Sequence, residues 1–336
     1  MNILYHMTNL PHKLPGTEAS LQELNTLRKH FGGEVVFINP NQTSPIYLPR
    51  LLFGFQLLKK IRKKEAQFQA HHLYNADPFP FPVLRWFKQP IIYSISSGVG
   101  NRRPNIGFFN SLAAVTVADE RSVQRLQSWG LNNVHLVRPS IDSSQLTHTP
   151  LALDSEIRLM VGSAPWMKSQ FQSKGIDALL EVAQQMPNLR LVCLWRGVLV
   201  EEMEQRVRQM KLGRQVEIIN QKVDINQILA SVHGSITLVT NPAIIRSYPH
   251  SLLESLAAGK PVIVSRSISM SDYVEQNQCG AVAETVTSAD ILNAIETLIR
   301  NYPNLQQNAQ RIGLRDFSPQ VMIDSFQQVY RQVLDH

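Results

Sequence analysis

Residues 247–265 read SYPHSLLESLAAGKPVIVS, and the rest of the chain can be interpreted outward from this stretch. A turn containing Tyr248 and Pro249 leads into a short helix, SLLESLAA, which Gly259 ends, and the apolar run PVIV then predicts a buried strand. The amides at such a helix start can face phosphate groups, and the carboxylate of Glu254 can accept hydrogen bonds from ribose hydroxyls. The alternative is a packing helix with Glu254 at its solvated edge.

The composition indicates a soluble globular protein of two domains. The chain has 336 residues, of which 43% are hydrophobic and 18% charged, and a length of this order predicts two domains. A net charge of +7 favours anionic partners such as nucleotide phosphates or lipid head groups. Only Cys193 and Cys279 occur, without metal-ligand spacing, so we expect buried free thiols in a reducing compartment. No signal peptide or membrane-spanning run is evident, which predicts a cytoplasmic protein.

Strands and helices alternate along both halves of the chain. In the first half, apolar runs that predict strands are NILYHM, EVVFIN, AHHLYN, QPIIYSIS, SLAAVTVA and NVHLVRPSID. After residues 149–156 the pattern restarts with IRLMVGS, LRLVCLW, VEIIN and SITLVT, separated by helical segments. Repeated strand–helix units predict parallel, doubly wound sheets, and hence an α/β fold. We place the first domain at residues 1–148 and the second at residues 149–317, with a last helix, 318–336, packing back on the first domain.

A basic segment lies in the first half at residues 49–68, PRLLFGFQLLKKIRKKEAQF. Its apolar start and its five basic residues from Lys59 to Lys64 are typical of an amphipathic helix that lies on an anionic membrane. The alternative is a helix docked on the sheet with a solvated basic face. A nucleic-acid partner is disfavoured because the basic residues lack interleaved aromatic residues or a known motif.

Polar residues follow several strands of the first half, where open parallel sheets bind ligands. His71 and His72 lie on one strand and point to opposite faces, so they form a poor metal pair, and at most one can face a cleft. We assign four candidate residues to the acceptor side of a ligand cleft: His72, Asp77, Ser96 and Arg102.

The chain resembles family 4 of the glycosyltransferases, which have two facing Rossmann-like domains, the GT-B fold. The segments that carry the resemblance are VADERSVQRLQSWGLNNVHLVRPSID, MVGS with KGIDALLEVA, SYPHSLLESLAAGKPVIVS and, more loosely, MSDYVEQNQCGAV. The resemblance implies transfer of a sugar from a nucleotide-diphosphate sugar, UDP- or GDP-linked, to a glycan or lipid-linked acceptor, with retention at the anomeric carbon. It also implies that neither a metal nor another cofactor is needed, and no D-x-D-like metal motif is evident.

Particular residues match the family's donor site. Glu254 matches the second Glu of its E-x7-E motif, Lys174 matches its diphosphate-binding lysine, and Gly16 matches the glycine of its first loop. The donor-binding set that the resemblance and the strand ends imply is Gly16, Gly162, Ser163, Lys174, Arg196, Tyr248, Ser251, Leu252 and Glu254. Lys174 and Arg246 are the candidates for catalytic stabilisation of the leaving diphosphate.

Three positions depart from the family pattern. Arg246 stands where the first Glu of E-x7-E is expected, and Ser163 stands where a diphosphate-binding Arg is expected. The His that often follows the strand matching QPIIYSIS is absent, and Ser96 or Ser97 occupies that region. Arg246 therefore either replaces the lost cation, binds an acidic sugar or acceptor, or marks a homologue that binds a nucleotide or sugar without transferring it.

Overall fold

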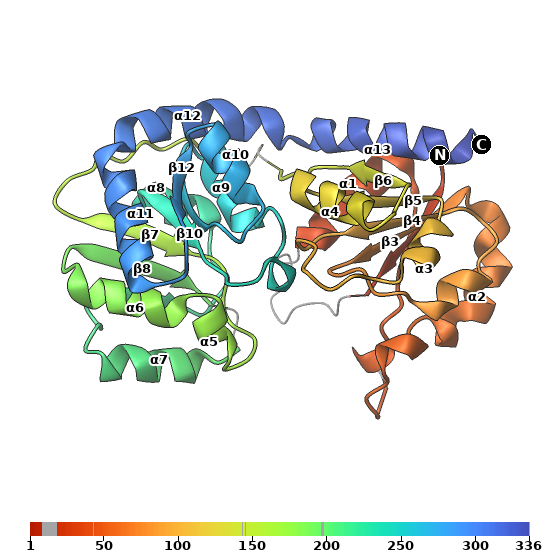
Figure 1. Ribbon diagram of the computed structural model, residues 1–336, viewed down its shortest axis with the longest axis horizontal. Coiled ribbons are helices and arrows are strands. Elements are labelled where there is room, and N and C mark those ends of the chain that lie inside the picture. The colour runs from red at the N-terminus through yellow and green to blue at the C-terminus, as the bar shows by residue number, and fades with distance from the viewer. Residues whose placement is uncertain (9–18, 43, 143, 145, 196–197, 336) are drawn as a thin grey trace. The chain divides into compact units, whose positions relative to one another are not determined.

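Two six-stranded parallel sheets organise the chain, one in each of two units (Figure 1). The computed structural model describes residues 1–8, 19–42, 44–142, 144, 146–195 and 198–335. One unit comprises residues 1–140 and 319–336, and the other comprises residues 141–318. The predicted α/β fold class is confirmed, and the chain passes to the second unit at Ile141, eight residues before the predicted boundary.

The sheet of the first unit has the order β2-β1-β3-β4-β5-β6, with every strand pair parallel. Its strands are β1 (Ile3–Met7), β2 (Gly33–Phe37), β3 (Ala70–Asn75), β4 (Ile91–Ile95), β5 (Ala114–Val117) and β6 (Val134–Leu136). Its helices are α1 (Ala19–Phe31), α2 (Leu58–Lys64), α3 (Ile106–Asn110), α4 (Glu120–Ser128) and α13 (Pro319–Leu334). Strands β1, β3 and β4 are buried along their whole length, whereas β2 is partly exposed because it forms an edge of the sheet.

Helices cover both faces of this first sheet. On one face, α1 and α13 pack on β1 and β3, and Phe31 meets Tyr330 edge to face at 5.0 Å between ring centroids. The other face is covered by α3, α4 and the 3-10 segment η5 (Pro82–Trp86), with α2 over β1 near the β2 edge. The last helix therefore belongs to the core of the first unit, as predicted.

The basic segment 49–68 is not one helix, and that prediction is wrong. It consists of η2 (Arg50–Leu52), η3 (Phe55–Leu57), the seven-residue α2 and η4 (Glu65–Gln67). Gly54 interrupts it with φ of +87°, a left-handed conformation that side chains other than glycine adopt at a cost, and an added Cβ there would lie 2.9 Å from Val83 Cγ1. The apolar pattern alone did not reveal this break.

The sheet of the second unit has the order β12-β11-β10-β7-β8-β9, also parallel throughout. Its strands are β7 (Ile157–Val161), β8 (Leu189–Leu194), β9 (Val216–Ile219), β10 (Gly234–Thr237), β11 (Val262–Ser265) and β12 (Gly280–Ala283). Its helices are α5 (Gln170–Ser173), α6 (Ile176–Gln185), α7 (Val200–Gln209), α8 (Ile225–Ser231), α9 (His250–Ala257), α10 (Met270–Gln276), α11 (Ser288–Arg300) and α12 (Tyr302–Asp316).

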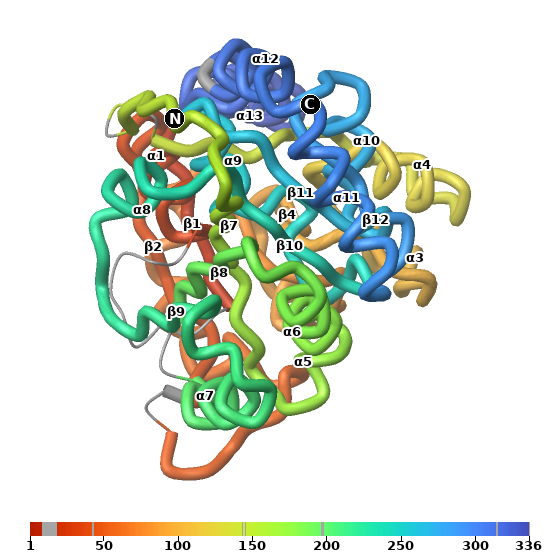
Figure 2. Tube along the Cα trace, turned by 90° about the vertical axis from the view of Figure 1, so that its left-hand side faces the viewer, coloured from red at the N-terminus to blue at the C-terminus, as the bar shows by residue number. Residues whose placement is uncertain are grey.

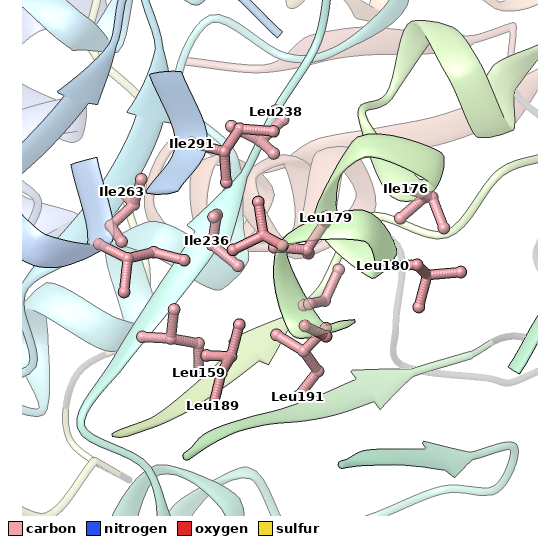
Figure 3. Close-up of a cluster of buried hydrophobic side chains, with 14 of the residues drawn as sticks. Leu159, Ile176, Leu179, Leu180, Leu189, Leu191, Ile236, Leu238, Ile263 and Ile291 are labelled. Atoms are coloured by element: carbon pink, nitrogen blue, oxygen red, sulfur yellow. The ribbon is translucent and has the colours of Figure 1, made fainter. Parts of the chain in front are cut away.

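The larger core of the second unit lies on the face covered by α6, α7 and α11. Leu159 of β7, Ile236 of β10 and Ile263 of β11 meet Leu179 of α6 and Ile291 of α11 there (Figure 3). The opposite face carries α8 and α9, and Figure 2 shows these two helices on the other side of the sheet from α6 and α11. Helix α9 is thereby held against the sheet near β10 and β11.

Candidate functional site

The strand order of the second sheet reverses at β7. From β7 the chain proceeds to β8 and β9 on one side and then returns to β10, β11 and β12 on the other. In open parallel sheets, the crevice outside the carboxyl ends of the strands at such a reversal is the usual ligand position. Gly162 follows β7 directly, and α9 follows β10, so both lie at this reversal.

Gly162 and Ser251 touch at the start of α9. A Cβ added to Gly162 would lie 2.5 Å from Ser251 Cβ and 2.7 Å from its Oγ, which is closer than real Cβ atoms approach. The position therefore accepts only glycine while the first turn of α9 keeps its place. The predicted donor residues Gly162 and Ser251, 89 positions apart in the sequence, are brought together by the fold.

Lys174 lies at the end of α5 and is brought to the same strand end. The residue is only 6% exposed, and Nζ donates hydrogen bonds to Ser163 Oγ at 3.1 Å and to the carbonyl of Ala164 at 3.0 Å. Gly175, which follows it, has φ of +66° and packs so closely on Leu238 that an added Cβ would lie 2.8 Å from Leu238 Cβ. Glycine is thus required at position 175 by the backbone conformation and by the close packing on Leu238. Lys174, just before it, places its ammonium group beside Ser163.

Glu254 lies one turn after Ser251 on α9, and residues three apart share a helix face. It is partly exposed, whereas Leu252 is completely buried. The amide of Leu252 donates to the carbonyl of Pro249 at 3.0 Å, so it is engaged within the helix start. The predicted phosphate contact through Leu252 is therefore disfavoured, and the amide role falls one residue earlier, on Ser251.

Tyr248 is a core residue, and the prediction that it contacts a donor is wrong. It is only 2% exposed, and its ring packs against Phe317 at 5.5 Å and Tyr273 at 6.0 Å between centroids. Arg246, two residues earlier, is partly exposed and follows the 3-10 segment η7 (Pro242–Ile244), so it lies on the loop between β10 and α9. Its place in the fold is compatible with a role near the helix start.

The first sheet has its own reversal between β1 and β3, and a polar network occupies it. Thr8 Oγ1, after β1, donates to Asn75 Oδ1 at 2.5 Å, at the end of β3. Arg50 makes two hydrogen bonds to Asp77, of 3.0 and 2.5 Å, and its guanidinium lies 4.2 Å from the ring centroid of Phe79. Burial raises the pKa of Asp77, but the hydrogen bonds from Arg50 outweigh this and keep it below its usual value.

Asp77 therefore lies where a ligand of the first unit is expected, but as half of an ion pair. The sequence did not indicate Arg50 as its partner, because a basic residue 27 positions earlier in an irregular segment gives no periodic signal. Ser96 is partly buried beside Asn75, whose carbonyl accepts from the Ser96 amide at 3.0 Å. Arg102 is exposed further along the same loop.

His72 is a core residue, and its assignment to the acceptor side is wrong. It is completely buried, and its ring nitrogens lie 2.7 Å from Tyr330 Oη and 2.6 Å from Ser94 Oγ. Burial lowers the pKa of His72 to about 3, so it is neutral. His71 points to the opposite face, as predicted, and reaches Glu65 at 2.9 Å. Both histidines are thus satisfied inside the first unit.

Two predicted donor residues, Gly16 and Arg196, lie outside the described residues. Cys193 and Cys279 are buried free thiols, as predicted, and burial raises the pKa of each to about 12. In the described part of the chain, no group of three His, Cys, Asp or Glu side chains is arranged to hold a metal ion. None of the described helices is both long and apolar enough to cross a membrane.

A family model matches most of the second unit. Residues 151–314, which contain the reversal at β7, match the family model of glycosyl transferases group 1. No curated protein sequence matches the chain significantly.

Solved structures share the fold over almost the whole chain. The crystal structure of Alr3699/HepE from Anabaena in complex with UDP is 16% identical, with a TM-score of 0.73 over 98% of this chain and 99% of that one. Sucrose-phosphate synthase from Thermosynechococcus elongatus is 14% identical, with a TM-score of 0.74 over all of both chains. A glycosyltransferase from Rickettsia africae is 12% identical, with a TM-score of 0.73 over 100% of this chain and 99% of that one.

At these identities the structural likeness shows the fold. The structural matches show that the chain has the GT-B fold, and the family model covers just under half of the chain.

Proposed function

We propose that this protein is a retaining hexosyltransferase of the family 4 type, which moves a sugar from UDP- or GDP-sugar to a glycan or lipid-linked acceptor. The observation that carries the proposal is the approach of Gly162 to Ser251, with Lys174 bound to Ser163 at the same strand end. Anabaena HepE, which shares the fold, was crystallised with UDP and with UDP-glucose, and this supports a nucleotide-sugar donor.

The chemistry requires charge stabilisation more than a nucleophile. As the bond between the anomeric carbon and the diphosphate oxygen breaks, the sugar ring gains positive charge and the diphosphate gains negative charge. The acceptor hydroxyl forms the new bond on the same face of the sugar, and its proton passes to the departing phosphate oxygen. Lys174 and the helix-start amide of Ser251 are suited to stabilise that phosphate, because preorganised donors in a closed site act most strongly there.

Glu254 is proposed to hold the donor ribose, since its carboxylate can accept both ribose hydroxyls. Arg246 is proposed to supply a second cation to the diphosphate, which lets the reaction proceed without a metal ion. The alternative is a non-catalytic homologue that binds a nucleotide or sugar. Arg246 in place of a sugar-contacting Glu is the observation that favours it.

The acceptor is proposed to approach the first unit beside Asp77, which follows β3, and Ser96, which follows the neighbouring β4. A glycan carried on lipid would place the protein in the cytoplasm, at the inner membrane surface. Residues 49–68 are proposed to make the peripheral membrane contact, because this segment concentrates the basic side chains of the first unit.

Isothermal titration and donor hydrolysis test the proposal. Purified protein is titrated with UDP-, GDP- and ADP-sugars without metal and then incubated with the donor that binds. We expect one nucleotide sugar to bind and to be hydrolysed slowly, with the anomeric configuration of any transferred sugar retained by NMR. Binding without hydrolysis or transfer to any offered acceptor would favour the non-catalytic alternative. If none of the donors binds, the enzyme proposal fails.

A further inference from the structure

A pocket of about 270 Å³ lies between α2 and the edge strand β2 in the first unit, away from the reversal between β1 and β3. Its apolar lining comes from both elements and from β1. The apolar lining residues are Leu4, Val35, Val36, Phe37, Leu57 and Ile61. Leu4 and Ile61 are almost completely buried and form a small core cluster with Phe68, whereas Phe37 is 37% exposed at the margin. The pocket therefore has a buried apolar floor and an accessible apolar side.

The polar lining is cationic on balance. Lys60, Lys64 and Glu34 complete the lining, and Lys64 Nζ pairs with Glu34 at 2.5 Å across α2 and β2. Among the described residues, no carboxylate lies within ion-pair distance of Lys59, Lys60 or Lys63. Glu34 thus neutralises one lysine, and Lys60 remains as the cation beside the apolar floor.

The segment that precedes α2 is tied to the carboxyl end of β2 and carries exposed apolar side chains. The amide of Gly54 and the Nε2 amide of Gln56 both donate to the carbonyl of Ile38, which follows Phe37. These bonds tie the segment after η2 to the end of β2. The large apolar side chains exposed in this region are Ile46, Tyr47, Leu51 and Leu52. Apolar area next to unpaired lysines is the pattern expected of a surface that meets an anionic bilayer.

We propose that the pocket between β2 and α2 is a binding site for an anionic membrane lipid, whose acyl chain enters the apolar floor while Lys60 contacts the headgroup phosphate. The inference deepens the membrane contact of the proposed function by assigning it a specific lipid site. It does not require transferase activity, since the donor residues that the structure describes belong to the second unit.

The test uses the full chain and vesicles of phosphatidylcholine, either alone or with about one-third phosphatidylglycerol. We expect binding only to the anionic vesicles. Lys60→Glu removes one positive charge and adds a negative one, which should weaken binding roughly 30-fold, at about fivefold per charge. The matched control is Lys29→Glu on α1, an exposed lysine of the same unit that does not line the pocket. Its effect should be no more than a few-fold.

Leu57→Trp tests the contribution of the pocket to lipid binding independently of surface charge, because it fills the apolar floor without changing the charge. Titration with a short-chain phosphatidylglycerol kept monomeric should show at least a tenfold loss of affinity, with Tm and UDP affinity unchanged. If Leu57→Trp lowers Tm, Val36→Met replaces it, since Val36 is only partly buried.

Three outcomes would overturn the proposal: equal binding to both vesicle types, equal effects of Lys60→Glu and Lys29→Glu, or unaltered lipid affinity after the pocket is filled. A parent protein that binds lipid but no nucleotide sugar would contradict the proposed function and leave the lipid site intact.

Discussion

Replacing Gly162 by alanine tests whether the start of α9 forms part of the donor site. The added Cβ would lie 2.5 Å from Ser251 Cβ, whereas carbon atoms in contact prefer a separation of about 3.5 Å or more. Ser251 and the first turn of α9 must therefore move by about 1 Å. Such overpacking costs about 1–3 kcal/mol of unfolding free energy. A displacement of this size at a preorganised site can also cost about 100-fold in function.

The assay pairs urea denaturation with titration of UDP or whichever nucleotide binds. Gly162→Ala should lose stability in the stated range and weaken nucleotide binding at least tenfold. Adding Ser251→Gly removes the clashing atoms, so the double variant should recover stability and show a coupling energy of about 1 kcal/mol or more. Gly213→Ala is the matched control, because a Cβ at Gly213 meets no atom within 4 Å.

Unchanged nucleotide affinity in a destabilised Gly162→Ala protein would refute the reasoning, since the contact would then serve packing only. If Ser251→Gly failed to rescue stability, the clash with Ser251 would not be the cause of the lost stability.

Three further predictions concern single residues. Glu254→Ala should weaken nucleotide binding about tenfold or more while Tm stays unchanged, because a hydrogen bond to a charged group is lost. A lowered Tm with unaltered nucleotide affinity would identify Glu254 as a packing residue. Lys260 is completely buried, and its Nζ has no hydrogen-bond partner among the described residues. Burial lowers its pKa to about 8, so the unfolded chain binds this proton more tightly than the folded protein does. The stability of the parent should therefore rise between pH 8 and about 10.5. Lys260→Met should accordingly be more stable than the parent below pH 8, by up to about 3 kcal/mol, and the difference should vanish towards pH 10.5; an advantage independent of pH in urea denaturation would contradict this. His72→Leu should cost about 1–3 kcal/mol by leaving Tyr330 Oη and Ser94 Oγ without their buried partner, with nucleotide affinity unchanged, and a variant as stable as the parent would argue against the network.

The strands could be predicted from the sequence because parallel strands buried on both faces appear as short apolar runs. AHHLYN coincides with β3, and IRLMVGS extends only two residues beyond the end of β7. The basic segment could not be predicted equally well. Its apolar and basic residues fit a helix, but the left-handed conformation at Gly54 depends on the close packing of Val83, which the local pattern does not contain.

The residues of the candidate site also fall into those that the sequence could predict and those that it could not. Lys174-Gly175 and the stretch around Ser251 were evident because glycine and a helix start leave local signals. Tyr248, in the loop before α9, and His72, inside β3, were misassigned because the sequence does not show whether such a side chain faces a ligand or a buried partner. Arg50 was missed since its ion pair with Asp77 depends on tertiary structure alone.

The return of α13 to the first unit has a consequence for the order of folding. Domains usually fold as they leave the ribosome, amino-terminal part first. Here the first sheet lacks one of its covering helices until Tyr330 has been synthesised, whereas every residue of the second unit is already available by Ser318. We therefore expect the second unit to acquire protease resistance earlier on arrested nascent chains, with the first unit protected only after release.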